Sequence, residues 1–251
     1  MTQRKQYEAS LKVLNTDLEK INKELLVSNT ELEQFAYIAS HDLQEPLRMI
    51  TGFLSQIERK YADLIDDKGK QYIFFAVDGA RRMRQIILDL LEFSRVGRSQ
   101  ESEEKVDVNA LIAEVGMLHQ GQVEELGAQI IIKTPLPVIR TMKGPLRQVF
   151  QNLIGNALKY HRKDIAPVIR ISFEETPAYW QFSIEDNGIG IDPEYRHKIF
   201  EIFQRLHNKD EYSGTGIGLA IVKKIIESLG GRILVKSAAE TGSIFFFTIK
   251  K

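Results

Sequence analysis

The sequence predicts a protein of mixed α and α/β class: a helical hairpin that pairs into a dimeric four-helix bundle, followed by an α/β sandwich. Three observations predict it. Apolar residues repeat at heptad spacing near the N-terminus, and a second heptad pattern follows a short turn. Beyond a polar linker, short alternating β-like runs are interleaved with helical stretches, which favours helices on one face of a sheet.

Residues 1–34 are predicted to form a parallel coiled coil. From Leu11 to Phe35, apolar residues are spaced by three and four in alternation, and only Ser28 breaks the pattern. The phase then shifts by four residues, a stutter that locally unwinds a coiled coil. Pro46 lies next to the stutter and removes one backbone donor, so the helix is expected to be deformable there.

Residues 35–96 are predicted to form the helical hairpin. The stretch "YADLIDDKGK" has the composition of a turn, and a second heptad pattern runs from Ile73 to Leu90. Two hairpins complete a four-helix bundle, so we expect a homodimer. Residues 97–105 are polar without periodicity and are predicted to be a linker, and residues 106–251 form the second domain.

The segment "QFAYIASHDLQEPLRMITGF" places His41 beside Asp42 in the first helix. His41 is two residues from the nearest seam positions, hence about 200° around the helix from them, and should face solvent. Taken alone, the segment is explained more simply by a kinked helix with a solvent-exposed histidine.

Charge and cysteine content exclude several classes of protein. Lysine plus arginine and aspartate plus glutamate number 34 each, so the chain has no basic field for nucleic acid. Cysteine is absent, which excludes disulfides and thiolate metal sites. No apolar run is long enough to insert into a membrane and the polar start is not a signal peptide, so we expect a cytoplasmic protein.

The second domain contains a run of amides, "QVFQNLIGNALKY". Gln148, Asn152 and Asn156 step by four and share one helical face, and Lys159 falls near it. Neutral oxygen ligands with one ammonium group suit a hydrated Mg²⁺ ion that carries phosphates. A polar helix face without a ligand is the alternative.

Two glycine-rich clusters follow. In "IEDNGIGIDP", Asp186 ends a strand, and Gly188 and Gly190 let the backbone approach a ligand. A buried carboxylate there could accept a hydrogen bond from an exocyclic amine such as that of adenine, and a tight Asn-Gly turn is the alternative. In "SGTGIGLAIVKKI", glycines precede a helix whose free N–H groups suit phosphate oxygens, although neither a dinucleotide fingerprint nor a P-loop is present.

Between these clusters lies "IFEIFQRL". Phe200 and Phe203 are expected to anchor a mobile segment on the core, and Arg205 is expected to reach phosphate. Residues 206–213 would then form a short lid over the nucleotide. Aromatic residues at this spacing are usually just part of a core, so this interpretation depends on their position between the glycine clusters.

Six motifs, in order, resemble the conserved boxes of the sensor histidine kinases of two-component signalling. "SHDLQEPLR" resembles the H box and "NLIGNALKY" the N box, while "DNGIGI", "IFEIFQR", "GTGIGLAI" and "ETGSIFFF" resemble the first G, F, second G and last G boxes. The resemblance covers residues 35–248. It implies a dimerisation and histidine-phosphotransfer domain followed by an ATP-binding domain of the Bergerat (GHKL) type.

The resemblance also implies roles for individual residues. His41 would be the phosphoacceptor and Asp42 the acid that assists its deprotonation. Asn156, and less directly Asn152, would face Mg²⁺. The residues implied to contact ATP are Asn152, Asn156, Lys159, Tyr160, Asp186, Gly188, Gly190, Arg205, Gly214, Thr215, Gly216, Gly218 and Leu219.

The same resemblance implies partners: an aspartate of a response-regulator receiver domain that takes the phosphoryl group, and an N-terminal sensor domain that precedes this sequence. Many family members have Thr or Asn four residues after the histidine, where it serves phosphatase activity. Here the residue is Glu45, so we expect weak phosphatase activity.

Three rival functions remain open. An ATPase machine or chaperone of the same nucleotide fold leaves His41, Asp42 and Pro46 without a role. A catalytically silent scaffold that binds ATP as a switch is disfavoured because His41 and the asparagines are present. A protein-serine kinase with the same ATP fold is disfavoured by the helical hairpin.

Overall fold

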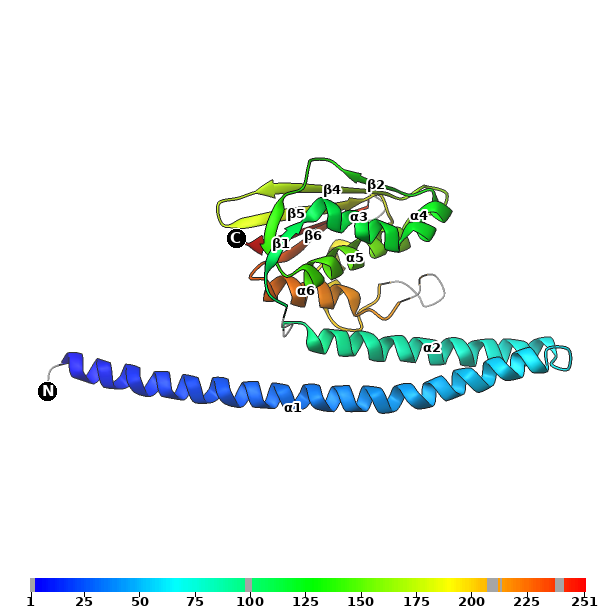
Figure 1. Ribbon diagram of the computed structural model, residues 1–251, viewed down its shortest axis with the longest axis horizontal. Helices are drawn as coiled ribbons and strands as arrows, with labels where there is room; N and C mark the ends of the chain where they lie inside the picture. Colours follow the sequence, from blue (N-terminus) through cyan, green and yellow to red (C-terminus); the bar gives the residue numbers. More distant parts are fainter. Residues whose placement is uncertain (1–2, 98–100, 207–211, 213, 238–241) are drawn as a thin grey trace. The chain divides into compact units, whose positions relative to one another are not determined.

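The computed structural model describes residues 3–97, 101–206, 212, 214–237 and 242–251 (Figure 1). The chain divides into two compact units, Met1–Ile87 and Leu88–Lys251, which are described separately below. In the first unit several side chains, among them that of His41, lie outside the described part.

The first unit contains helix α1 (Gln3–Lys60) and most of helix α2 (Asp67–Arg95), whose residues from Leu88 onward belong to the second unit. Helix α1 continues through Pro46, the residue predicted to make it deformable. The two helices are antiparallel and joined by a short loop (Figure 1). The loop ends where Asp66 Oδ1 accepts a hydrogen bond from the backbone N–H of Gly69 (2.8 Å), which caps the first turn of α2.

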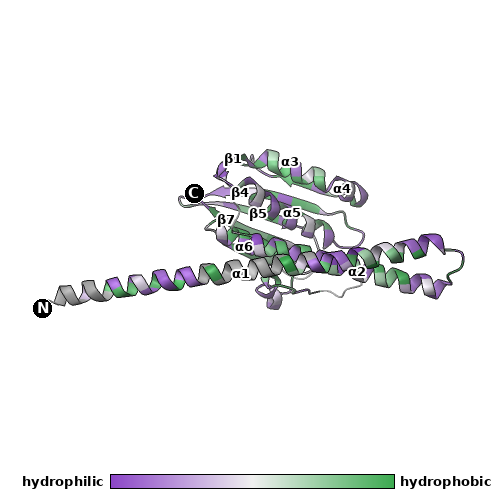
Figure 2. Cartoon of the chain, turned by 60° about the horizontal axis from the view of Figure 1, so that its bottom comes forward, coloured by the Kyte–Doolittle hydropathy of each residue, from purple (hydrophilic) through white to green (hydrophobic). Residues whose placement is uncertain are grey.

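The hairpin exposes much of its apolar surface. Leu47, Val77 and Ala80 are buried, but Leu14 and Leu18 of the predicted coiled-coil seam are 66% and 63% exposed. Hydrophobic bands alternate with hydrophilic ones along both helices (Figure 2). A single hairpin therefore leaves uncovered the seam that the heptad pattern predicts.

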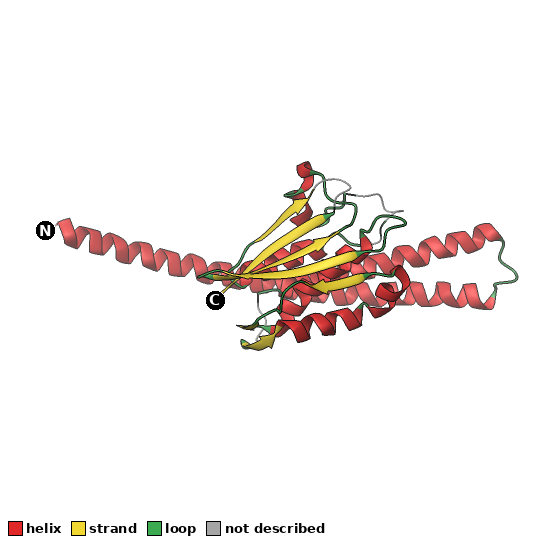
Figure 3. Cartoon of the chain, turned by 90° about the horizontal axis from the view of Figure 1, so that it is seen from above, coloured by secondary structure: helices red, strands yellow, loops and turns green. Residues whose placement is uncertain are grey.

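The second unit contains a five-stranded mixed sheet with strand order β2-β4-β5-β7-β6 (Figure 3). Only the β2–β4 pair is parallel, and the other neighbours are antiparallel. The strands are β2 (Gln129–Ile132), β4 (Val168–Glu175), β5 (Tyr179–Asp186), β6 (Ile233–Ser237) and β7 (Ser243–Lys250).

Three helices, α3 (Val108–Leu118), α5 (Lys143–Lys159) and α6 (Gly218–Ser228), cover one face of this sheet (Figure 1). The core centres on three fully buried rings. Phe150 of α5 contacts Phe182 of β5 and Phe247 of β7 edge to face, with centroids 5.8 and 5.5 Å apart. The predicted α/β sandwich with helices on one face is confirmed.

Two local features differ from the prediction. The sequence predicts one helical stretch near residues 109–125, but the structure divides it at His119 into α3 and a short α4 (Gln120–Leu126). A two-stranded antiparallel sheet of β1 (Glu104–Asp107) and β3 (Val138–Thr141) was not expected, and β1 begins inside the range predicted as linker.

Two 3₁₀ turns, η1 (Pro193–Tyr195) and η2 (Lys198–Phe200), follow β5. Among the described residues, no helix is both long enough and apolar enough to cross a membrane.

Candidate functional site

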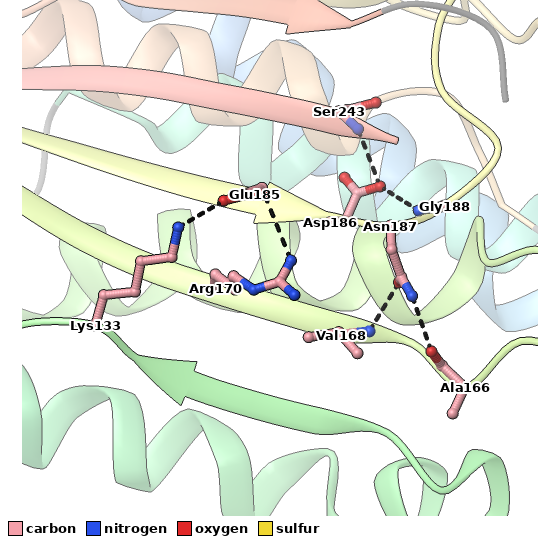
Figure 4. Close-up of polar contacts among 9 residues, drawn as sticks. All are labelled: Lys133, Ala166, Val168, Arg170, Glu185, Asp186, Asn187, Gly188 and Ser243. Carbon is pink, nitrogen blue, oxygen red and sulfur yellow. Dashed lines mark hydrogen bonds and ion pairs between the residues drawn. The ribbon is translucent and has the colours of Figure 1, made fainter. Parts of the chain in front are cut away.

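The carboxylate of Asp186 is held at the end of β5 by two turns (Figure 4). Its Oδ1 atom accepts hydrogen bonds from the backbone N–H of Gly188 (2.8 Å) and of Ser243 (3.2 Å). Ser243 begins β7, the neighbour of β5 in the sheet. The carboxylate is thus fixed by the turn that directly follows it, at Gly188, and by a second turn far away in the sequence, at Ser243.

Burial changes the ionisation of this carboxylate. Loss of solvent raises the pKa of Asp186 to about 6, against the lowering effect of the bonds from Gly188 and Ser243, and the charge of Glu185 adds a smaller increase. A partly buried carboxylate with a raised pKa in a pocket is a typical functional-site feature.

The side chain of Asn187 fixes the other side of the same turn. Its Oδ1 accepts from the backbone N–H of Val168 (2.8 Å) and its amide donates to the carbonyl of Ala166 (3.0 Å) (Figure 4). Arg162 Nε donates to the carbonyl of Asn187 (2.9 Å). The tight Asn-Gly turn considered from the sequence is therefore held in place by the hydrogen bonds of Asn187. Asp186, the residue before it, lines the pocket.

Glycine is required where these turns meet. A Cβ on Gly188 would lie 2.4 Å from the carbonyl oxygen of Tyr160, and one on Gly242 would lie 2.0 Å from that of Asp186. Gly190 has a φ of +75°, a left-handed conformation that favours glycine. The glycines thus allow the turn after β5 to pack closely against the chain, and the predicted approach of Gly188 and Gly190 to a ligand stays a prediction.

Helix α5 presents the predicted amides. The Nδ2 atom of Asn152 donates to the carbonyl of Gln148 (3.0 Å). A Cβ on Gly218 would lie 2.7 Å from Asn152 Oδ1, so this oxygen faces the first turn of α6. One turn further along α5, Asn156 lines the pocket.

Lys159 and Tyr160 lie at the C-terminal end of α5. Lys159 Nζ donates to Tyr160 Oη (2.8 Å) and lies 4.3 Å from the centre of that ring. A Cβ on Gly214 would be 2.5 Å from Lys159 Nζ, so the ammonium group reaches the glycine turn that precedes α6. The structure brings together residues that the sequence separates by more than fifty positions.

That glycine turn has an open helix N-terminus. Gly214 and Gly216 have positive φ angles of 142° and 77°, and the backbone N–H of Ile217 is 3.4 Å from Thr215 Oγ1. Ile217 precedes α6 and makes no side-chain capping bond to it. The first N–H groups of α6 thus carry no side-chain cap, as phosphate binding requires.

These features surround one pocket. Of the predicted residues, six line it directly, and the remaining ATP-site candidates lie in the elements around it. The lining residues are Asn156, Ala157, Tyr160, Asp186, Ile189, Gly190, Ile191, Ile199, Gln204, Arg205, Leu206, Leu219, Ser243 and Phe245.

The expected aromatic anchor is wrong. Phe203 is 55% exposed, and Phe200 is only half-buried, whereas Ile199 is buried and lines the pocket. The backbone of Phe203 has a φ of +65° and its N–H bonds the carbonyl of Gly216 (3.1 Å). This turn directs the side chain of Phe203 outward, so Ile199 of η2 anchors the segment instead.

Arg205 lines the pocket and donates through Nη2 to the carbonyl of Tyr212 (2.6 Å). The centroids of the Tyr212 and Tyr160 rings are 5.1 Å apart. Leu206, the first residue of the predicted lid at 206–213, lines the pocket, and apart from Leu206 and Tyr212 the lid falls on residues outside the described part.

The sequence did not identify the apolar walls, which include Ile199 and Phe245, or the backbone of Ser243 as a partner of Asp186. The motif "ETGSIFFF" was the only signal for Ser243. In the first unit His41 lies within α1, and the side chains of Asp42, Glu45 and Pro46 beside it are exposed.

Comparison with known proteins matches a domain family to the helical part of the chain and another to the α/β part. Residues 31–99 match the His Kinase A (phospho-acceptor) domain, and residues 142–251 match the histidine kinase-, DNA gyrase B- and HSP90-like ATPase domain. The chain belongs to the sensor histidine kinases. Its catalytic part is an ATPase domain of the GHKL type.

Relatives of this sensor histidine kinase include cyanobacterial phytochrome A of Nostoc sp., 45% identical over 93% of this chain. The phytochrome-like protein Cph1 of Synechocystis sp. is 41% identical over 93% of the chain. The chain spans only 30% and 31% of these two relatives.

Solved structures share the fold. Full-length ShkA in complex with AMPPNP is 27% identical and matches 86% of this chain and 45% of its own, with a TM-score of 0.66. The catalytic domain of histidine kinase ThkA is 26% identical and matches 60% of this chain and 98% of its own, with a TM-score of 0.51.

Proposed function

We propose that this chain is the kinase portion of a signalling protein, which binds Mg·ATP, phosphorylates His41 and passes the phosphoryl group to an aspartate of a response-regulator receiver. The observation that carries the proposal is the half-buried Asp186, held by two glycine turns in a pocket that is also lined by Asn156 of α5 and Leu219 in the first turn of α6. This combination has a hydrogen-bond acceptor for a base at one end and donors for phosphates at the other.

Different residues bind the base, the phosphates and the ribose of the nucleotide. Asp186 accepts a hydrogen bond from the exocyclic amine of adenine, between walls formed by residues such as Leu219 and Phe245. Lys159 and the N–H groups of the turn at residues 214–218 bind phosphate oxygens. Arg205 and Tyr160, which also line the pocket, contact phosphate or ribose.

The site fits a magnesium ion. Among the described residues no group of three or more His, Cys, Asp or Glu side chains could hold a metal, and the oxygens available near the turn are the carboxamides of Asn152 and Asn156. Mg²⁺ keeps several waters and takes one or two protein ligands plus phosphates, which suits this set. When bound, it would neutralise charge on the phosphates. We assign Asn156 as the direct ligand and Asn152 as a supporting one.

Phosphotransfer requires an exposed nucleophile. One ring nitrogen of His41 attacks the γ-phosphorus, the N–P bond forms, the bond to the β-phosphate oxygen breaks and ADP leaves with that oxygen. Asp42, which is exposed on α1, fixes the tautomer and takes the proton of the other ring nitrogen. The phosphoramidate is labile, so the group passes on to a receiver carboxylate.

We propose that the functional unit is a homodimer in which coiled-coil residues such as Leu14 and Leu18, exposed in one chain, face a second copy. Glu45 is exposed where other family members carry a phosphatase residue, so regulator dephosphorylation is expected to be weak. Fast dephosphorylation by the unaltered chain, with no gain in Glu45→Thr, would refute this part.

Incorporation of label from γ-labelled Mg·ATP tests the proposal, with His41→Gln and Asp42→Asn alongside. The expected label is stable to alkali, labile to acid, absent from His41→Gln and slowed in Asp42→Asn. Unchanged labelling of His41→Gln would show that another residue accepts the phosphoryl group. ATP binding without any labelling would favour the silent scaffold.

A further inference from the structure

The hydroxyl group of Ser237, the last residue of β6, joins the two turns that hold Asp186. Ser237 Oγ accepts a hydrogen bond from the backbone N–H of Ile191 (2.7 Å) and donates one to the carbonyl oxygen of Gly242 (2.7 Å). Ser243 Oγ lies 3.0 Å away and donates to Ser237, whose only proton is used on Gly242. One side chain thus links the turn after β5 to the turn before β7.

The separation of these two turns controls the direction of the Asp186 carboxylate. Each turn supplies one N–H group, Gly188 from the first and Ser243 from the second, and both bind Oδ1. Within the described part of the chain Oδ2 accepts no hydrogen bond, and Asp186 lines the pocket. Any change in the distance between the turns therefore rotates Oδ2 relative to the pocket.

We propose that Ser237 is a positioning residue for the nucleotide base: it holds the two turns at a fixed separation, aims Asp186 Oδ2 at an exocyclic amine and so sets the preference for a 6-amino purine. The inference rests on the proposed nucleotide site. Ser237 is not among the residues that line the pocket, so it acts through Asp186.

Geometry around Ser237 supports a fixed rather than an adjustable link. The backbone carbonyl of Ser237 accepts a hydrogen bond from Arg196 Nη2, which ties the end of β6 to the residue after η1. Gly242 has a φ of +85° and its Cα faces the carbonyl of Asp186, so the second turn fits only close against the first. The hydroxyl bridges two backbones that are already in contact, and its loss would let them separate.

An experiment has to distinguish this positioning role of Ser237 from a purely structural role. Removing the hydroxyl leaves the N–H of Ile191 without its partner and lowers stability in either case. Only the positioning role predicts that the loss depends on the substituent at position 6 of the purine.

The experiment measures the affinity of the purified chain for ATP and for ITP, which carries a 6-oxo group, by titration calorimetry without phosphotransfer. In Ser237→Ala we expect ATP affinity to fall about fivefold to tenfold and ITP affinity by less than about twofold. Ser237→Thr, which keeps the hydroxyl, should retain the ATP preference. Ser172→Ala is a matched control, because Ser172 also pairs with a strand serine hydroxyl, that of Ser183 (2.6 Å), away from the turns.

A double-mutant cycle completes the test. In an Asp186→Asn background, adding Ser237→Ala should leave the ATP-to-ITP ratio unchanged, because the group on which Ser237 acts is gone. Equal losses for ATP and ITP in Ser237→Ala, or an unchanged ratio with a lower melting temperature, would overturn the inference. An unaltered chain that binds neither nucleotide would overturn the proposed function with it.

Discussion

The helical hairpin and the α/β domain bury their apolar residues in different ways. In the α/β domain Phe150, Phe182 and Phe247 are fully buried within one chain. In the hairpin the buried positions among the described side chains are few, and Leu14 and Leu18 remain largely exposed. A single chain therefore buries the core of its α/β domain but leaves apolar residues of its helical hairpin exposed.

This difference separates two kinds of stability. The α/β domain has a core of its own and is expected to unfold in a transition independent of protein concentration. In the proposed homodimer a second copy completes the hairpin, so the stability of the hairpin is expected to depend on protein concentration by mass action. Variants that act on one kind of stability and spare the other distinguish the two regions.

The largest effect is expected from Phe182→Ala. Truncating this ring removes its contacts with Phe150 and Phe247 and should lower the free energy of unfolding of the α/β domain by about 3–5 kcal/mol. Trp180, the one tryptophan of the chain, lies on β5 and reports this transition during urea unfolding.

The matched control is Phe203→Ala, because Phe203 is 55% exposed. It should change the free energy of unfolding by less than about 0.5 kcal/mol. Comparable losses in the two variants would contradict the assignment of the core.

In the hairpin, Leu18→Asp should weaken dimerisation by more than about tenfold, since burying a leucine contributes roughly 1.5–3 kcal/mol. The Trp180 unfolding transition should stay unchanged, because Leu18 belongs to the other unit. Sedimentation velocity over a concentration series measures the first quantity.

Asp17→Asn serves as the control for this variant, because Asp17 is the exposed neighbour outside the seam. A Leu18→Asp chain that stays dimeric at low concentration would contradict the coiled-coil seam.

The same contrast explains what could be predicted from the sequence. Heptad spacing and strand alternation are properties of contiguous residues, so both long helices and the strands of the main sheet were predicted from local patterns. Strands β1 and β3 pair although α3, α4 and β2 lie between them in the sequence, and no local pattern encodes such a distant pairing.

The site shows the same limit. Asp186, the α5 amides and the glycine turns were identified from local motifs and from the family resemblance. The bond from Ser243 to Asp186 depends on β5 and β7 being neighbours in the sheet, which no local pattern encodes. Phe203 was misassigned because hydrophobic character does not give direction, and a φ of +65° turns this side chain outward.

A smaller effect concerns pH. Because the pKa of Asp186 is raised to about 6, nucleotide affinity should be constant above about pH 7 and fall by up to about tenfold per pH unit below 6, as the acceptor becomes protonated. Calorimetric titration of ATP between pH 5 and 8 measures this.

The stability of the folded chain depends on pH with the opposite sign to nucleotide affinity. The folded-state pKa lies above the ordinary value of 3.8, so protonation of Asp186 favours the folded state. This contribution to the free energy of unfolding of the nucleotide-free chain is lost as pH rises through about 6. Asp186→Asn, which cannot titrate, should lack both dependences and corrects for protonation of ATP itself.

The smallest effect is expected from the charges on the other face of β5. Glu185 is next to Asp186, points to the opposite side of the sheet, and pairs with Lys133 (2.9 Å) and Arg170 (3.4 Å) (Figure 4). Its negative charge raises the pKa of Asp186. Glu185→Gln should therefore shift the midpoint of the affinity profile to lower pH, while Lys133→Gln, which leaves Glu185 less neutralised, should shift it to higher pH. Because both partners are partly exposed, the shifts are expected to be a fraction of a pH unit and to shrink in high salt. Shifts of the same sign in both variants would mean that altered packing of β5, and not charge, changes the carboxylate.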